Sequence, residues 1–467
     1  MWLAGCLPEL ARFRRANVEE SQRDILQRLL ITNAHTAFGE QHAFSYIKTV
    51  YDYQQRLPLR TYEDFEPWID RIAGGETNVL TREPVKLFEP TSGSSGATKL
   101  IPYTDSLQRE FQRGIRPWVA DLFLNYPELM NGQAYWSVSP ACRTVFSPSK
   151  IPIGFDDDST YVGGWQRQLV RAVTLTDLDD DTRNVRLISV WNPTFLSLLV
   201  KDRPTESLFP NVRLISCWTD ANAAGPASHL ATLFPQAKIQ GKGLIATEGF
   251  ISFPMIGHEG TALAIRSHFL EFIPIGSEKA LLAHQLDRGQ QYAVVISTGG
   301  GLYRYRLDDV IEVVGHIGRC PLIRFIGRQN YVSDWFGEKL NEAYVSSVLR
   351  ETFEEFAIAP SFAMLACDSE IPAYVLYADG EIPYGAIAKI ESRLRRCFHY
   401  DYARLLGQLG PLRLFRAERA AEVYQQFCVR NGQKAGDVKP PALDRRNGWS
   451  HIFPASTSLM NLTSSRK

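Results

Sequence analysis

The stretch EPTSGSSGATKLIPYT (residues 89–104) places five Gly or Ser residues among the eight from 91 to 98. Such a run is either a flexible linker or a rigid loop that holds an anion. The apolar segments on both sides, PVKLF (84–88) and LIPY (100–103), have the composition of short buried strands. We therefore predict a rigid turn whose backbone N–H groups and hydroxyls bind phosphate.

The spacing of this loop differs from that of the Walker A loop. That motif has four residues between its two glycines and a Lys directly after the second. Here Gly93 and Gly96 have two residues between them, and Lys99 comes three residues after Gly96. The loop is therefore predicted to bind phosphate, but not in the manner of P-loop kinases and GTPases.

The bulk composition is that of a globular protein. The 467 residues are enough for two or three domains, and 45% of them are hydrophobic and 22% charged. Lys plus Arg (51) equals Asp plus Glu (51), so the net charge is zero. This balance argues against a nucleic-acid binder that relies on general basicity.

Membrane and secretory signals are also missing from the sequence pattern. No apolar run reaches the roughly 18–20 residues that span a bilayer, and the start MWLAGCLPEL does not fit a signal peptide. The seven cysteines form no CxxC pair and are odd in number, which fits free thiols in a reducing cytosol. We predict a soluble, cytoplasmic monomer that binds neither nucleic acid nor membranes.

Alternation of strand and helix patterns predicts an α/β fold. Residues 1–60 have helical periodicity, and a further helix, kinked at Pro117, follows the glycine-rich loop. The strings NVRLISVW (184–191) and NVRLISCW (211–218) are nearly identical, and each precedes a plausible helix. Two adjacent βα units would explain the likeness, although chance resemblance between short strands would as well. A strand-dense region follows, with strands predicted at YAVVIST (292–298), LYRYRL (302–307), VIEVVGH (310–316) and LIRFIGR (322–328).

Two motifs place carboxylates at the ends of predicted strands. GKGLIATEGF (241–250) is an apolar run that ends in Thr247 and Glu248. A Glu at the end of a buried strand is costly unless it is paired or binds a cation. GGGLYRYRLDDV (299–310) places Asp309 just beyond an aromatic strand, where its carboxylate can accept both hydroxyls of a ribose.

The composition changes after about residue 330. FIGRQNYVSDWFGEKLNE (325–342) closes a strand with Gly327 and Arg328, and a smaller α+β segment follows. That segment has strands near 362–367 and 373–378, a long helical stretch near 385–409 and a tail rich in Gly, Lys and Pro. We predict a large N-terminal domain, 1–330, and a small C-terminal domain, 331–467.

The order of these motifs resembles the adenylate-forming superfamily of acyl-CoA synthetases and luciferases. The match is nearest to its auxin-responsive branch, the Gretchen Hagen acyl-acid amido synthetases, especially the bacterial members. The resemblance runs almost end to end. It is carried by NAHTAFGEQHAF (33–44), LPLRTYEDFEPWIDRIAGGE (57–76), VWNPTFLSLL (190–199), LISCWTDANA (214–223), GLYRYRLDDV (301–310) and GQKAGDVKPPAL (432–443).

This resemblance implies the adenylate-forming fold, with mixed sheets and helices in the large domain and a mobile small domain. It also implies a two-step reaction. An acyl acid attacks the α-phosphate of ATP, which releases pyrophosphate and leaves an acyl adenylate. An amine, usually that of an amino acid, then attacks the activated carbonyl to form an amide.

The resemblance further assigns the ATP site. The phosphates would be held by Thr91, Ser92, Ser94 and Ser95, with Lys99 near them. Glu248 would hold Mg²⁺, Thr247 would contact the adenylate phosphate, and Asp309 would bind the ribose. Arg328 would lie at the hinge beside the nucleotide. Lys439 of the small domain would swing in to stabilise developing charge, and Lys339 is a second candidate for that role.

Two positions depart from the superfamily pattern. Its Tyr-Arg-x-Gly-Asp motif has Asp308 here in place of Gly. A second carboxylate beside Asp309 would raise the pKa of one partner if both were buried, or it faces solvent, or it weakens nucleotide binding. Leu244 replaces a Tyr that often stacks on adenine, so apolar contact with the base remains and stacking does not.

Two rival functions share the first half-reaction or its site. One is a ligase that transfers the acyl group to a thiol such as coenzyme A. The other is a non-catalytic adenylate-binding relative, with Asp308 as the sign of decay. The sequence favours amide formation through the resemblance, and the presence of the expected carboxylates and cations disfavours decay. The identities of the acid and the amine are not predicted.

Overall fold

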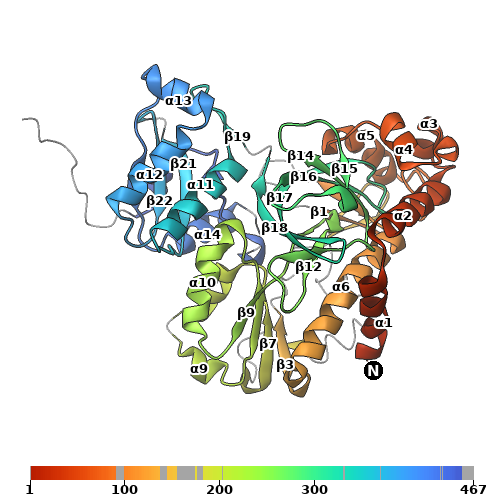
Figure 1. The fold of residues 1–467 in the computed structure, drawn as a ribbon, viewed down its shortest axis with the longest axis horizontal. Helices are drawn as coiled ribbons and strands as arrows, with labels where there is room; N and C mark the ends of the chain where they lie inside the picture. The colour runs from red at the N-terminus through yellow and green to blue at the C-terminus, as the bar shows by residue number, and fades with distance from the viewer. Residues whose placement is uncertain are drawn as a thin grey trace, which may run out of the picture. The chain divides into compact units, whose positions relative to one another are not determined.

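The computed structural model describes residues 2–90, 99–136, 145–154, 174–175, 182–201, 203–329, 332–368, 370–431, 433 and 435–454 (Figure 1). These residues form two compact units. Unit 1 comprises Met1–Ser189, Glu206–Ser216 and Gln236–Phe325. Unit 2 comprises Val190–Thr205, Cys217–Pro235 and Ile326–Lys467. The division into functional domains at residue 330 remains a prediction.

Helices make up the first part of unit 1, as the periodicity of residues 1–60 predicts. They are α1 (Trp2–Arg15), α2 (Val18–Asn33), α3 (Ala37–Gln41), α4 (Val50–Arg56), α5 (Tyr62–Ala73) and α6 (Asp105–Asn125). Helix α4 starts with a capping box in which Thr49 and Asp52 each accept the other's backbone N–H at 3.0 Å. Helix α6 includes Pro117 and lies beside α1 (Figure 1).

A seven-stranded antiparallel sheet forms the centre of unit 1, with the order β12-β13-β18-β17-β16-β14-β15. Its strands are β12 (Ser252–Pro254), β13 (Thr261–Leu263), β14 (Phe269–Pro274), β15 (Leu281–Leu282), β16 (Gln291–Ser297), β17 (Tyr305–Ile317) and β18 (Cys320–Arg328). Along β16, Val294 and Ile296 enter the main hydrophobic core, whereas Ala293 and Val295 enter a second cluster. Both faces are therefore covered, which explains the continuous apolar runs.

Two further sheets complete unit 1. One has the order β2-β1-β5-β4, with β1 (Leu87–Pro90), β2 (Leu100–Tyr103), β4 (Val145–Phe146) and β5 (Pro152–Ile153). The other has the order β6-β3-β7-β8-β9, with β3 (Gln133–Trp136), β6 (Thr174–Leu175), β7 (Val185–Ser189), β8 (Leu214–Cys217) and β9 (Lys238–Gly241). Strands β7 and β8 pair in parallel. The two near-identical strings therefore are neighbouring strands, each followed by a helix, α8 (Pro193–Leu199) and α10 (Ala224–Leu233).

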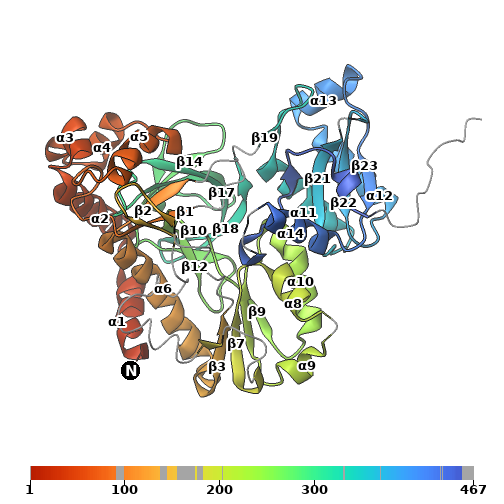
Figure 2. The same cartoon turned by 180° about the vertical axis from the view of Figure 1, so that it is seen from behind.

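Unit 2 contains a four-stranded sheet that is covered on both faces (Figure 2). Its order is β23-β22-β21-β24, with β21 (Ala363–Asp368), β22 (Ala373–Ala378), β23 (Arg413–Arg416) and β24 (Leu443–Asp444). Alternate residues of β21 enter different cores. Leu365 packs in the cluster that includes α11 (Glu342–Glu355) and α12 (Tyr384–Leu394), and Met364 packs in the cluster that includes α14 (Ala420–Arg430) and α15 (Trp449–Ile452).

Polar contacts join the segment 190–205, from the middle of the chain, to the C-terminal part of unit 2. The Asn192 side chain donates to the carbonyl of Val438 at 2.5 Å. Lys201 pairs with Glu422 at 3.0 Å. Helix α8 and the chain around it therefore join residues that lie more than two hundred positions later.

Three details differ from the predicted elements. The strands expected at 302–307 and 310–316 form the single strand β17, because a bulge rather than a turn separates them. The helical stretch expected at 385–409 is two helices, α12 and α13 (Phe398–Leu405), separated at residues 395–397. Within the tail, Leu443–Asp444 adds a parallel strand beside β21. In the described parts of the chain, no helix is both long and apolar enough to cross a bilayer.

Gln22 links α2 to the central sheet and predicts a measurable stability loss. Its amide nitrogen donates to the carbonyls of Ile265 (2.8 Å) and His268 (2.9 Å), and its oxygen accepts from the Leu270 N–H (2.7 Å). Gln22→Leu would leave these buried groups unpaired, at a cost of about 2–4 kcal/mol in the free energy of unfolding. Urea denaturation would measure this loss. The matched control is Gln27→Leu on the exposed side of α2, and equal midpoints for the two variants would contradict the prediction.

Candidate active site

The predicted Thr-Glu motif forms the turn of a tight hairpin. Strands β10 (Ile245–Ala246) and β11 (Gly249–Phe250) pair antiparallel, with Ala246 opposite Gly249. Thr247 and Glu248 are therefore the two turn residues, and both are partly exposed. The turn therefore carries both residues to which the resemblance assigns phosphate contact and Mg²⁺ binding.

Leu244 lies at the base of the same hairpin. Its backbone N–H donates to the Ser252 hydroxyl at 2.9 Å, and its carbonyl accepts from the Ile251 N–H at 3.0 Å. The side chain is 9% exposed. Leu244, Thr247 and Glu248 thus lie on one hairpin, and their use by one ligand stays a prediction.

Asp309 lies in a bulge of β17. Ala293 of β16 pairs with Val310 and Val295 pairs with Arg306, so residues 307–309 oppose a single residue of the neighbouring strand. Asp308 has φ +62°, in the left-handed region that favours glycine. A glycine, which the resemblance leads us to expect at this position, adopts such a conformation without strain. Asp tolerates it better than most residues do, because its short polar side chain bonds locally.

The two neighbouring carboxylates have different surroundings. Asp309 is 4% exposed. The side chain of Asp308 is 26% exposed and lies 3.8 Å from the Arg306 guanidinium. The bulge thus directs one carboxylate inward and leaves the other in partial contact with solvent and a cation, so Asp308 in place of Gly does not put two buried carboxylates side by side.

Tyr305 connects the hairpin to β17. Its hydroxyl donates to Oε1 of Glu248 at 3.3 Å. Burial, and then the charge of Glu248, raise the pKa of Tyr305 well above its usual value. The hydroxyl therefore keeps its proton and acts as a donor. Sequence reasoning gave Tyr305 no role, although its place in the Tyr-Arg motif was the available signal.

The described part of the glycine-rich region begins at Lys99. Its ammonium lies 5.4 Å from the centre of the Tyr62 ring, and the Tyr62 hydroxyl accepts the N–H of Leu100 at 2.8 Å. Strands are present on both sides of the loop as predicted, although the first lies at Leu87–Pro90 and not at 84–88. The structure adds that β1 and β2 pair antiparallel. Thr91, Ser92, Ser94 and Ser95 lie outside the described residues.

Unit 2 carries the other predicted cations. Arg328 is exposed at the end of β18. Lys339 is exposed and has φ +44°, beside Glu338, whose carboxylate accepts the N–H groups of Trp335 (2.9 Å) and Phe336 (2.7 Å). The loop that presents Lys339 is therefore held by its own buried carboxylate.

Lys439 lies against an aromatic face within unit 2. Its ammonium is 3.8 Å from the centre of the Trp218 ring, and Trp191 lies 5.8 Å from Trp218, centre to centre. The side chain is exposed. A cation–π contact at an exposed site contributes about 0.5–1 kcal/mol. That amount is small enough for a phosphate to compete for the ammonium.

Glu248 is the predicted magnesium ligand. In the described part of the chain, no group of three or more His, Cys, Asp or Glu side chains is arranged to hold a metal ion. Mg²⁺ needs no such group, since it is commonly bound by one or two carboxylates together with substrate phosphates and water. The partly exposed carboxylate of Glu248, oriented by Tyr305, fits that mode of binding.

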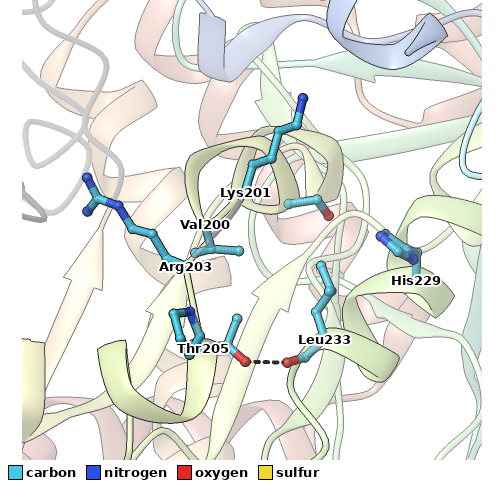
Figure 3. Close-up of a pocket in the computed structure, with 8 residues that line it drawn as sticks. Val200, Lys201, Arg203, Thr205, His229 and Leu233 are labelled. Carbon is cyan, nitrogen blue, oxygen red and sulfur yellow. Dashed lines mark hydrogen bonds between the residues drawn. The ribbon is translucent and has the colours of Figure 1, made fainter. Parts of the chain in front are cut away.

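A pocket of about 350 Å³ lies in unit 2 (Figure 3). Lys201, Arg203 and His229 contribute positive or polar groups to its lining, and the Thr205 hydroxyl donates to the Leu233 carbonyl at 2.5 Å. None of the predicted nucleotide-site residues lines it. The candidate active site therefore rests on the arrangement of the motif residues and not on this pocket.

Comparisons with known proteins confirm the family that the resemblance predicts. The family model described as the GH3 family N-terminal domain matches residues 9–164, and the GH3 family central domain matches residues 261–328. The chain is similar to a protein of Arabidopsis thaliana named indole-3-acetic acid-amido synthetase GH3.5. The two are 32% identical over 479 residues, which cover 78% of this chain and 75% of the relative.

Solved structures show the same fold. The acyl acid amido synthetase AtGH3.15, in complex with 2,4-DB, aligns with a TM-score of 0.81 and 18% identity over 96% of this chain and 95% of that one. A 2-hydroxyisobutyryl-CoA ligase in the postadenylation state aligns with a TM-score of 0.51 and 11% identity over 87% of this chain and 91% of that one. The predicted α/β adenylate-forming fold is therefore confirmed.

The left-handed conformation of Asp308 predicts a residue-specific effect on stability. Asp308→Val should lower the free energy of unfolding by about 1–2 kcal/mol, because a β-branched side chain is strained at positive φ. Asp308→Gly should cause no such loss. Urea denaturation of both variants would measure the difference, with Glu312→Val in the regular part of β17 as the matched control. Equal tolerance of Val at positions 308 and 312 would contradict this account.

Proposed function

This chain belongs to the GH3 family, and from that premise we propose that it is an ATP-dependent acyl-acid amido synthetase. Relatives of the chain are named indole-3-acetic acid-amido synthetase, jasmonoyl-L-amino acid synthetase and acyl acid amido synthetase. The observation that supports the proposal most directly is the link between Glu248 and β17. The Tyr305 hydroxyl joins the Thr-Glu hairpin to the strand that carries Asp309, as one nucleotide spanning both motifs requires.

The proposed reaction has two balanced steps. The carboxylate of the acid attacks the α-phosphorus of ATP, the bond to the β-phosphate oxygen breaks, and pyrophosphate leaves. The amine nitrogen then attacks the acyl carbonyl, loses a proton, and AMP departs as the C–N bond forms. Both steps develop negative charge on phosphate oxygens, which positioned cations and N–H groups stabilise.

Each predicted residue has a proposed part in these steps. Asp309 accepts hydrogen bonds from the ribose hydroxyls through a mostly buried carboxylate at the bulge of β17. Thr247 contacts the adenylate phosphate, and Glu248 holds Mg²⁺, which would neutralise charge on the phosphates. Leu244 provides the apolar contact with adenine. Lys99, Arg328 and Lys439 supply positive charge during adenylation, with Lys339 as the alternative to Lys439.

We prefer an amine over a thiol as the acyl acceptor. The 32% identical relative is named an amido synthetase, whereas the likeness to the coenzyme A ligase concerns the fold alone. A non-catalytic role is disfavoured, since Asp308 is accommodated in its bulge without displacing Asp309. The enzyme is proposed to act as a monomer in the cytoplasm on small-molecule substrates. The six cysteines within the described residues, all free thiols, agree with a reducing compartment.

Product analysis would test the proposed function. With ATP, Mg²⁺, an amino acid and a panel of aromatic and fatty acids, mass spectrometry should detect an N-acyl amino acid together with AMP. Asp309→Ala tests the proposed ribose contact in the same protein. The loss of a hydrogen bond to a charged group, about 1.5–3 kcal/mol, should weaken ATP binding roughly tenfold or more in calorimetry. An acyl thioester formed only with coenzyme A, and no amide, would assign the protein to the thiol class.

Lys439 should matter more in the first half-reaction than in the second. Pyrophosphate departs during adenylation, so a cation that neutralises it acts mainly there. In Lys439→Ala, acyl-adenylate formation should slow far more than amide formation from an acyl adenylate supplied ready-made. Rapid-quench assays of the two half-reactions would measure both rates, with Lys389→Ala on α12 as a surface control. Equal losses in the two steps would favour Lys339 as the cation.

A further inference from the structure

We propose that the buried pair Glu110–His268 is a positioning unit for the nucleotide site. It holds the Thr247–Glu248 hairpin and the glycine segment before β17 against α6. This inference rests on the proposed function. Neither residue belongs to the motifs that identify the family, and neither was singled out by the sequence.

The geometry of the pair fixes its hydrogen-bond pattern. Nδ1 of His268 lies 2.9 Å from Oε2 of Glu110, and Nε2 of His268 accepts the backbone N–H of Phe250 at 2.9 Å. Because Nε2 is an acceptor, the ring proton is on Nδ1 and is donated to the carboxylate. His268 is 0% exposed and Glu110 is 5% exposed. The imidazole ring thus bridges the Glu110 carboxylate and the backbone of the hairpin.

The same carboxylate oxygen also holds a second segment. Oε2 of Glu110 accepts the backbone N–H of Gly299 at 2.8 Å. Gly299 opens the GGG run that leads into β17 and Asp309. One atom on α6 is therefore hydrogen-bonded to the start of one predicted motif and, through His268, to Phe250 at the end of another.

Two glycines show how closely the backbone approaches the pair. A Cβ on Gly249 would lie 3.1 Å from Nε2 of His268, and a Cβ on Gly299 would lie 3.0 Å from Oε1 of Glu110 and 2.6 Å from Cβ of Ser106. Any side chain at these positions would push the backbone away from its acceptor. The absence of side chains at both positions matches a role in holding main chain at short range.

The chain around His268 is itself held in place. The Ser267 hydroxyl donates to the Glu110 carbonyl at 2.5 Å, and Gln22 donates to the His268 carbonyl. The Phe111 ring packs edge-on against the imidazole, with ring centres 5.9 Å apart. With its backbone and ring fixed, His268 has little freedom to follow the hairpin if the hairpin moves. These contacts support the proposal that the pair positions the hairpin.

A matched carboxylate on the same helix separates positioning from stability. Asp121 of α6 is 2% exposed and accepts the Ile256 N–H at 2.8 Å and an Arg14 N–H at 3.0 Å. It therefore has the same kind of bonds as Glu110, but it contacts neither motif. Glu110→Leu and Asp121→Leu should destabilise the protein by similar amounts, because each leaves buried donors unpaired.

Kinetics of pyrophosphate release would test the inference in the intact protein. At temperatures where both variants are folded, kcat/KM for ATP should fall roughly tenfold or more further in Glu110→Leu than in Asp121→Leu, the factor that corresponds to one lost charge-assisted hydrogen bond. Glu110→Gln should largely restore it, since its amide oxygen can accept both N–H groups. Equal kinetic losses in the two Leu variants would overturn the proposal.

Amide hydrogen exchange gives a readout that does not depend on activity. In Glu110→Leu, and in His268→Phe as a second variant, the amides of Phe250 and Gly299 should exchange roughly tenfold or more faster, whereas Asp121→Leu should leave them protected. Unchanged protection of both amides in Glu110→Leu and His268→Phe would overturn the inference. If the unmodified protein releases no pyrophosphate with any acid, the proposed function fails, and the exchange result still decides the positioning role.

Discussion

A buried carboxylate oxygen, Oε2 of Glu110, accepts hydrogen bonds from His268 and Gly299, which come from different parts of the sequence. A charge inside a protein core is tolerated only when donors surround it. The inward position of Glu110 on helix α6 is therefore stabilised by donors from both segments. The helix, the hairpin and the entry into β17 are thus linked through one carboxylate oxygen and one imidazole ring.

The fold could be predicted well because its sheets are covered on both faces. Strands such as β16 and β22 are continuous apolar runs, and their predicted limits agree closely with the structure. The repeated strings at 184–191 and 211–218 proved to be adjacent parallel strands. The errors come from local backbone chemistry. A bulge inside β17 has the same polar residues as a turn, and the break at residues 395–397 contains no Gly or Pro to mark it.

Candidate site residues that lie within the sequence motifs could be predicted. Leu244, Thr247 and Glu248 share a hairpin, and the special position of Asp308 follows from its positive φ. The residues that hold these motifs were not predictable. Glu110 is one of several polar residues along α6, and nothing in its local sequence shows that it faces inward toward a histidine 158 positions later. Tyr305 was visible as part of a motif, but its partner became apparent only from the structure.

The composition of unit 2 has a consequence for how such chains can recombine. Its residues come from three separate stretches of the sequence, and the Asn192–Val438 and Lys201–Glu422 contacts join the middle of the chain to its end. A crossover that exchanged only the C-terminal part between two homologous genes would pair side chains from different parents at these contacts. Chimaeras should therefore take residues 190–205 and 217–235 from the same parent as the C-terminal part. Both partners of each contact then come from one protein.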